Sequence, residues 1–222
     1  MMAMIGEILP LALGIAVSPI PIIAVILMLM SPRARSTAVG FLTGWLGGII
    51  VAATVFTLLS SFLPEGDDGA RPIRGIIHLA LGVLLLFVAA RQWKSRPKND
   101  EQPDLPKWMQ AVDSMAFGKA LGLAVLLVAV NPKNLVMSAS AGLAIGSAGT
   151  APGVSAAVVV IFTVLAGATV WVPVVGFLLA SERLRAPLEK LRIWLVQQNS
   201  TIMSILLLVL AVNAIGKGLG SF

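Results

Sequence analysis

Cysteine is absent from the 222-residue chain, and histidine occurs only once, at His78. The first absence excludes a disulfide framework and a thiolate metal site, and a single histidine cannot build a metal cluster. We therefore expect no metal and no cofactor. Charge is also scarce: 12% of the residues are Asp, Glu, Lys or Arg, whereas 58% are hydrophobic and the mean hydropathy is +0.96. This composition excludes a soluble globular protein, in which about a quarter of the residues are charged.

The apolar residues form continuous stretches, several of them near the length of about 20 residues that a membrane-spanning helix needs. They lack the alternation of barrel strands, and lipid cannot satisfy an open backbone, so helices are expected. We predict an all-α, polytopic membrane protein with six transmembrane helices. The predicted spans are residues 8–30, 37–63, 73–90, 117–145, 154–180 and 201–215.

Lysine and arginine are distributed unequally between the two sets of connections. Of the sixteen, twelve lie in residues 33–35, 91–119 and 183–192, which follow the first, third and fifth predicted spans. Arg71, Arg74 and Lys217 lie on the opposite side, and Lys133 falls within a span. Connections rich in basic residues stay in the cytoplasm. We predict a multi-pass protein of the bacterial plasma (inner) membrane with both termini facing outward.

Residues 91–102 are charged and contain proline, which is typical of a linker. Residues 106–115 and 181–196 each gather apolar side chains on one helical face, which predicts amphipathic helices at the membrane surface. An ordinary solvated connection is the alternative for both. The predicted domains are a three-helix repeat over residues 1–93, a cytoplasmic basic linker over 94–116 and a second three-helix repeat over 117–222.

A short motif recurs in the two halves of the chain. The sequence AVSP at residues 16–19 returns as AVNP at residues 129–132, 113 residues later, inside the first of three spans in each half. With three spans each, the halves would enter the membrane in opposite orientations. Inverted repeats with helix breaks at matching positions point to a transporter site near the middle of the bilayer.

The proline in each motif predicts the break itself. Pro132 cannot donate an amide hydrogen and clashes with the preceding turn, so the helix should stop near Asn131. Asn131 is a good N-cap, and Pro132 suits the first position of a second half-helix. Ser18 and Pro19 can do the same in the first span, and Pro21 would deepen that disruption.

Two half-helix N-termini that meet near the bilayer centre would offer free amides and a positive dipole to an anion. Lys133 adds a full positive charge there, and an ionisable residue within a span is a functional candidate. The alternatives are an architectural proline kink and a lysine that snorkels to the outer interface. The predicted substrate-binding residues are Ser18, Pro19, Pro21, Asn131, Pro132, Lys133 and Asn134.

Other polar and small residues give weaker indications. Glu7, His78 and Asn213 are the candidate path or gate residues. An interfacial position is the alternative for the first two, and pairing with another helix is the alternative for the third. Gly40, Gly44 and Gly48 predict a close-packing helix face in the second span, a face that would also suit a homodimer.

No Asp or Glu lies deep in any predicted span. This absence argues against proton coupling through carboxylates and against a pathway for metal cations. An anion that leaves an inside-negative cell gains about 2.3 kcal/mol per charge per 100 mV, so its export would need no such relay. No Ser/His, Asp/Asp or His/Glu constellation lies in the spans, so we predict that the protein is not an enzyme.

The stretches GIAVSPIPIIAVILML and VAVNPKNLVMSASAGLA, together with the basic connection between the halves, resemble the lysine-exporter (LysE) superfamily. The closer resemblance is to its GAP/SAP branch, the sulfolipid- or glycopeptidolipid-addressing proteins of actinobacteria, and it covers nearly the whole chain. It implies a six-helix inner-membrane transporter. Members of the branch are linked to export of envelope glycolipids, and the wider superfamily exports amino acids and other small solutes.

Three functions are compatible with these features. The first is an exporter or flippase for an anionic, lipid-linked cell-envelope component, whose headgroup is held at the paired breaks with Lys133. The second is a small-solute exporter of the amino-acid type, and the third is a non-transporting accessory protein of an envelope-lipid export complex. The expected partners are membrane lipid and the anionic lipid or small-molecule substrate, with no nucleic acid. A homodimer or an envelope-export complex is also compatible.

The orientation can be tested directly because the chain has no native cysteine. A cysteine introduced at Asp100 lies in the predicted cytoplasmic linker. It should therefore stay unlabelled by a membrane-impermeant thiol reagent in intact cells. Labelling of intact cells at this position would show that the orientation is inverted.

Overall fold

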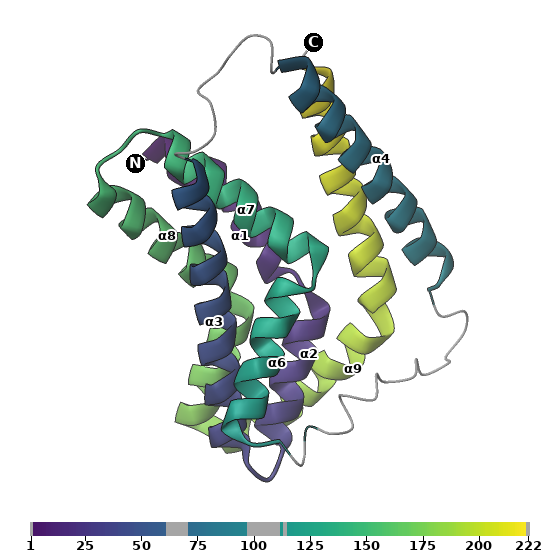
Figure 1. The fold of residues 1–222 in the computed structure, drawn as a ribbon. Helices are drawn as coiled ribbons and strands as arrows, with labels where there is room; N and C mark the ends of the chain where they lie inside the picture. Colours follow the sequence, from purple (N-terminus) through teal and green to yellow (C-terminus); the bar gives the residue numbers. More distant parts are fainter. Residues whose placement is uncertain (1, 61–70, 97–111, 113–114, 221–222) are drawn as a thin grey trace. The chain divides into compact units, whose positions relative to one another are not determined.

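The computed structural model describes residues 2–60, 71–96, 112 and 115–220, and the regular elements in these residues are α-helices (Figure 1). The helices are α1 (Met2–Ala16), α2 (Pro19–Met30), α3 (Ala34–Leu59), α4 (Arg71–Lys94), α6 (Phe117–Ala129), α7 (Pro132–Ser147), α8 (Pro152–Ala166) and α9 (Ala168–Leu219). The all-α prediction is confirmed, and the predicted surface helix at residues 106–115 lies almost wholly outside the described residues.

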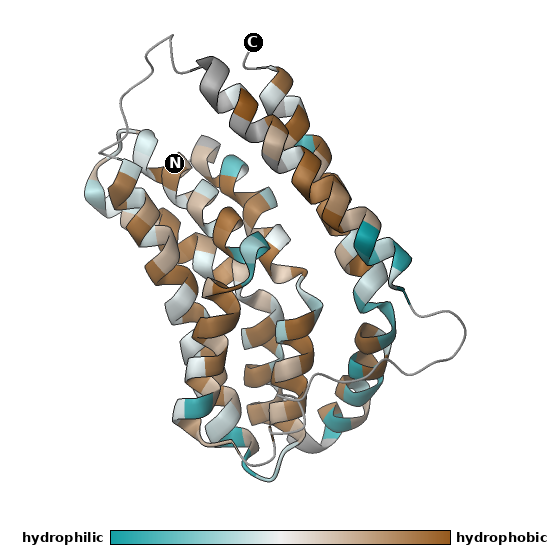
Figure 2. Cartoon of the chain, turned by 45° about the vertical axis from the view of Figure 1, so that its right-hand side comes forward, coloured by the Kyte–Doolittle hydropathy of each residue, from teal (hydrophilic) through white to brown (hydrophobic). Residues whose placement is uncertain are grey.

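Apolar residues dominate most of these helices (Figure 2). Two helical stretches, α3 and residues 183–216, are long and apolar enough to cross a membrane. Three bent pairs also qualify, so the described residues hold two to five candidate spans. The chain is thus a multi-pass membrane protein, and the count of six spans stays a prediction.

The two predicted breaks are present, and a third accompanies them. The pair α1 and α2 is bent by 56°, and the pair α6 and α7 by 73°. Residues 154–180 were expected to form one continuous span, but α8 and the first part of α9 are bent by 68° around Gly167. A side chain at Gly167 would collide with Leu46 of α3, so glycine allows the bend to lie directly against that helix.

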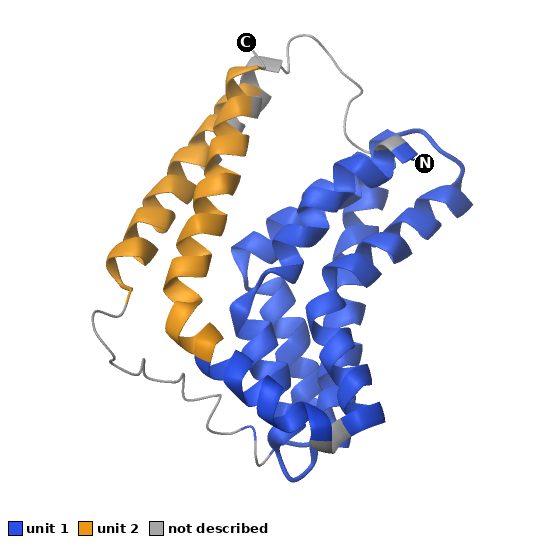
Figure 3. Cartoon of the chain, turned by 180° about the vertical axis from the view of Figure 1, so that it is seen from behind, with its two compact units in different colours: residues 1–63, 105–193 blue, residues 64–104, 194–222 orange. Residues whose placement is uncertain are grey.

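The chain forms two compact units that do not follow its sequence halves (Figure 3). The first comprises residues 1–63 and 105–193, and the second comprises residues 64–104 and 194–222. Each unit therefore takes segments from both predicted repeats. The division into repeats over residues 1–93 and 117–222 stays a prediction.

Within the first unit, α3 packs closely on α6 through the predicted glycine face. A side chain at Gly40 would meet the Phe117 carbonyl, and one at Gly44 would meet the Leu121 carbonyl. The helices therefore approach each other backbone to backbone. This confirms the predicted close-packing face. Because α6 of the same chain fills it, this face is not available for a homodimer.

The same helix also supports α7, beyond the bend. A side chain at Gly142 would collide with the Ala53 carbonyl, and one at Gly146 would collide with Ser60. Helix α3 thus runs along both arms of the bent pair, and small residues on each arm allow close contact. This packing holds the break between α6 and α7 at a fixed place along α3.

In the second unit, α4 packs against the end of α9. A side chain at Gly82 would meet Ile215 and the Ala211 carbonyl, and one at Gly218 would meet Leu79. Small residues again set the separation of two apolar helices.

Helix α9 differs from the sequence-based prediction. Its only non-helical residue is Ala180, and the helix then runs on to Leu219. Residues 181–196 and the last predicted span therefore form one helix, not a separate surface helix followed by a span. Leu188 and Leu195 are buried on one face, and Arg192 forms an ion pair with Glu189 one turn away.

Two matched substitutions test the packing of α3. Gly44→Val places a branched side chain against the backbone of α6, and we expect a loss of about 1–3 kcal/mol or more in the free energy of unfolding. Gly47→Val adds the same side chain where nothing lies within 4 Å, so it controls for helix propensity. Thermal unfolding in detergent measures both. Equal melting temperatures for the two variants would contradict the close packing of α3 on α6.

Candidate functional site

The candidate site is the place where the breaks of three helix pairs come together, which we call the break junction. Its residues are Gly14, Ala16 and Val17 at the end of α1, Lys133 at the start of α7 and Thr169 at the start of α9. Helices α1 and α7 pack against each other in the first unit (Figure 1).

The break in the first span leaves backbone carbonyls without their helical donors. The Val17 amide still donates to Leu13, but the Ser18 amide turns back to Ala16 at 2.9 Å instead of reaching Gly14. The Gly14 carbonyl is therefore left without its usual partner. In apolar surroundings such a carbonyl costs free energy unless another donor reaches it.

Lys133 supplies this donor. Its Nζ atom donates to the Gly14 carbonyl at 2.6 Å and to the Val17 carbonyl at 3.4 Å, and the side chain is only 4% exposed. A helix C-terminus carries a partial negative charge, so a cation is favoured at this position. The ammonium group thus lies against the end of α1 and is buried in the first unit.

Thr169 joins the third break to the same point. Its hydroxyl donates to the Ala16 carbonyl at 2.7 Å, from the first turn of α9. On the far side of that break, the Trp171 indole donates to the Val164 carbonyl at 2.9 Å. Side chains of α7 and α9 therefore donate hydrogen bonds to carbonyls that the break leaves without helical donors at the end of α1. These bonds link the three bent pairs. The sequence analysis did not predict a role for Thr169. The only feature that could have indicated the break beside it is Gly167.

The capping role predicted for Asn131 is confirmed. Its side chain accepts from the Lys133 amide at 3.1 Å, and Pro132 holds the first helical position of α7. Ser18 occupies the N-cap position of α2, followed by Pro19, but its side chain makes no capping hydrogen bond. Both half-helices thus begin where the sequence predicts.

The half-helix N-termini offer fewer free amides than expected. Pro19 and Pro21 have none, and the Lys133 amide is already used by Asn131. In the first turns of α2 and α7, the Ile20 and Asn134 amides have no acceptor within the described residues. A bound anion at this site would depend mainly on the ammonium group of Lys133.

Two side chains on α7 are buried without complete hydrogen bonding. The Asn134 amide nitrogen lies 3.4 Å from the Leu127 carbonyl, but its Oδ1 atom has no donor within the described residues. The same holds for the hydroxyl of Ser138, one turn further on, and both residues are fully buried. Buried polar atoms without partners are costly, so these two atoms are candidate ligand contacts. Ser138 was not predicted, although it follows Asn134 by four residues on the same helix.

The predicted path or gate residues are divided between the two units. Glu7 is exposed on α1 in the first unit, and Asn213 is exposed in the second unit. His78 lies in α4, and its side chain is outside the described part of the structure. In the described residues, no group of three or more His, Cys, Asp or Glu side chains could hold a metal ion. The roles of Glu7, His78 and Asn213 stay predictions.

The family model of Sap, sulfolipid-1-addressing protein, matches residues 8–220, which include all three breaks and Lys133. The chain belongs to this family. The resemblance to the LysE-related GAP/SAP branch is thereby confirmed, and membership implies a role in envelope-lipid transport. Comparisons with curated proteins and with solved structures give no match.

The hydrogen bonds of the break junction predict a loss of stability in two variants of this Sap family member. Lys133→Met keeps the length of the side chain but leaves the Gly14 carbonyl without a donor, at an expected cost of about 1–3 kcal/mol. Thr169→Val removes one of two donors to Ala16 and should cost about 1 kcal/mol. Thermal unfolding of the purified protein measures both.

Thr43→Val is the matched control, because the exposed Thr43 hydroxyl bonds only the Val39 carbonyl of its own helix. It should melt as the unmodified protein does. A Lys133→Met protein that is as stable as the Thr43→Val protein would show that Lys133 does not hold the end of α1.

Proposed function

We propose that the protein is an inner-membrane exporter or flippase for an anionic, lipid-linked envelope component whose headgroup binds at the break junction. The observation that carries the proposal is the buried lysine whose hydrogen-bond partners are backbone carbonyls. No carboxylate among the described residues lies within ion-pair distance of it. An isolated cation inside a membrane is expensive and is a functional candidate for that reason.

The proposed mechanism is an exchange of partners by Lys133. The end of α1 offers the ammonium group only about half an elementary charge, whereas a sulfate or phosphate ester offers a full charge. An arriving headgroup can therefore take the lysine from Gly14 and Val17. That exchange would release the end of α1 from α7 and so couple binding to a movement between the two helices. Asn134 and Ser138 would then contact the polar part of the headgroup.

Membership in the Sap family supports a lipid substrate with a negative headgroup. The family is named for a sulfolipid, and a sulfate ester carries the charge that Lys133 would bind. Transport toward the outside would be favoured by the membrane potential, at about 2.3 kcal/mol per charge per 100 mV. We propose the orientation that goes with this direction, with both termini outside and the basic connections in the cytoplasm.

A small-solute exporter is the second candidate. The observation that favours it is the buried pair of unfilled polar atoms, Asn134 Oδ1 and Ser138 Oγ, because a small polar solute could satisfy them without an acyl chain. Transport assays that offer both substrate classes separate the two candidates.

The test uses the purified protein in liposomes that contain a fluorescent anionic lipid or radiolabelled amino acids. Lys133→Ala should abolish movement of the anionic lipid. Lys133→Arg should keep part of it, because the charge survives while its shape and hydration change. Lys133→Glu should be worse than alanine, since it repels the substrate.

Thr169→Val is the control for these variants, because it weakens the same junction without changing the charge. It should keep most of the transport, measured per folded protein. Full lipid transport by folded Lys133→Ala would contradict the proposal, and transport of amino acids alone would favour the second candidate.

A further inference from the structure

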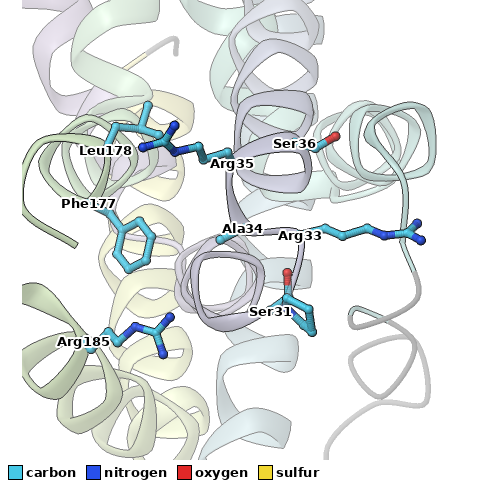
Figure 4. Close-up of a pocket in the computed structure, with 9 residues that line it drawn as sticks. Ser31, Arg33, Ala34, Arg35, Ser36, Phe177, Leu178 and Arg185 are labelled. Carbon is cyan, nitrogen blue, oxygen red and sulfur yellow. The ribbon is translucent and has the colours of Figure 1, made fainter. Parts of the chain in front are cut away.

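A cavity of about 480 Å³ lies in the first unit, away from the break junction (Figure 4). It is formed by the turn between α2 and α3 and by α9. The residues that line it include Arg33, Arg35, Ser36, Phe177, Leu178 and Arg185. Among the described side chains, no acidic residue lines it, and none of its three arginines forms an ion pair.

The arginines are not equivalent. In Figure 4, Arg35 and Arg185 lie on either side of Phe177, whereas the guanidinium group of Arg33 extends in the opposite direction. The cavity thus has a pair of guanidinium groups from two helices that are about 150 residues apart in the chain. Such groups bind sulfate and phosphate oxygens with two parallel hydrogen bonds each.

The start of α3 adds backbone donors to the same cavity. The amides of Arg35 and Ser36 lie in the first turn of this 26-residue helix and have no acceptor within the described residues. The turn itself is held by internal bonds. The Ala34 amide donates to Ser31 at 3.1 Å, and the buried Thr37 hydroxyl donates to Arg33 at 3.0 Å. The donors that remain for a ligand are therefore already in place.

The remaining wall is apolar. Phe177 is 5% exposed and packs into the unit, while Leu178 is 39% exposed. A cavity of this volume is larger than a single sulfate or phosphate ion, and an apolar wall beside two arginines fits an ester better than a free ion. We propose that this cavity binds the phosphate or sulfate group of an anionic lipid headgroup on the side of the membrane predicted to be cytoplasmic.

Two helices lead from this cavity to the break junction. Helix α2 begins at the first break and ends at the cavity, about 18 Å away at 1.5 Å per residue. The first part of α9 carries Thr169 at the junction and Phe177 at the cavity. That a lipid headgroup binds in this cavity before it reaches the break junction rests on the proposed function. Binding at the cavity can nevertheless be measured by itself.

The experiment measures binding of short-chain phosphatidic acid to the purified full chain in neutral detergent by native mass spectrometry. The Arg35→Gln/Arg185→Gln variant should lose about tenfold or more in affinity, because it removes two charge-assisted contacts. Arg33→Gln is the control, because it lies in the same turn but removes a guanidinium group that extends away from Phe177. This variant should bind the lipid within about twofold of the unmodified protein. In a Lys133→Met background, which removes lipid binding at the break junction, the double variant should cause the same loss; this separates failure of this proposal from failure at the junction.

Inorganic phosphate serves as the second probe. If it competes as strongly as the lipid, the oxyanion site is confirmed and its ligand is a soluble anion; if acyl chains are required, the ligand is a lipid headgroup. Unchanged affinity in the folded double variant would overturn the proposal. An equal loss of affinity in Arg33→Gln would also overturn it, because the loss would then come from the lower overall surface charge.

Discussion

The backbone carbonyls released at the end of α1 are the constraint on which the rest of the site depends. A helix that breaks inside a membrane must find other donors for these carbonyls, because lipid supplies none. Here the donors come from the two other broken pairs, as Lys133 of α7 and Thr169 of α9. One set of unsatisfied acceptors therefore joins three breaks that are far apart in the sequence, and it places a cation among them.

The same constraint changes how the lysine should be understood. A charge that only stabilised a helix end could be replaced by a hydroxyl, as Thr169 shows at the neighbouring carbonyl. The lysine instead adds a full charge whose hydrogen-bond partners are partial negative charges, so an anion of the right size can compete for it. Helix α3 packs against both α6 and α7 and so holds α7 in place, and α7 is the helix from which α1 can be released.

The sequence predicts the features that depend on a single residue type and its neighbours. A proline directly after Ser18 and after Asn131, both at N-cap positions, predicts the two breaks. The spacing of the glycines predicts the close-packing face of α3. The sequence could not predict the partner of Lys133, because that partner is a backbone carbonyl, which every residue has. The third break was missed because Gly167, at the end of α8, is a residue type that also forms packing faces between helices. Arg35 and Arg185 lie in separate predicted connections, and only the fold brings them to one cavity.

The most direct test of the account is the rate of disulfide formation between cysteines at Gly14 and Met137 in native membranes. A side chain at Gly14 would lie 3.1 Å from the Met137 sulfur, on the two helices that Lys133 joins. The account predicts rapid cross-linking that slows when Lys133→Met is added. The pair Gly48→Cys and Val128→Cys, whose Cβ atoms would be 3.3 Å apart, serves as the reference. Cross-linking of the reference pair without cross-linking of residues 14 and 137 would contradict the account. A cross-linking rate that is unchanged by Lys133→Met would contradict it as well.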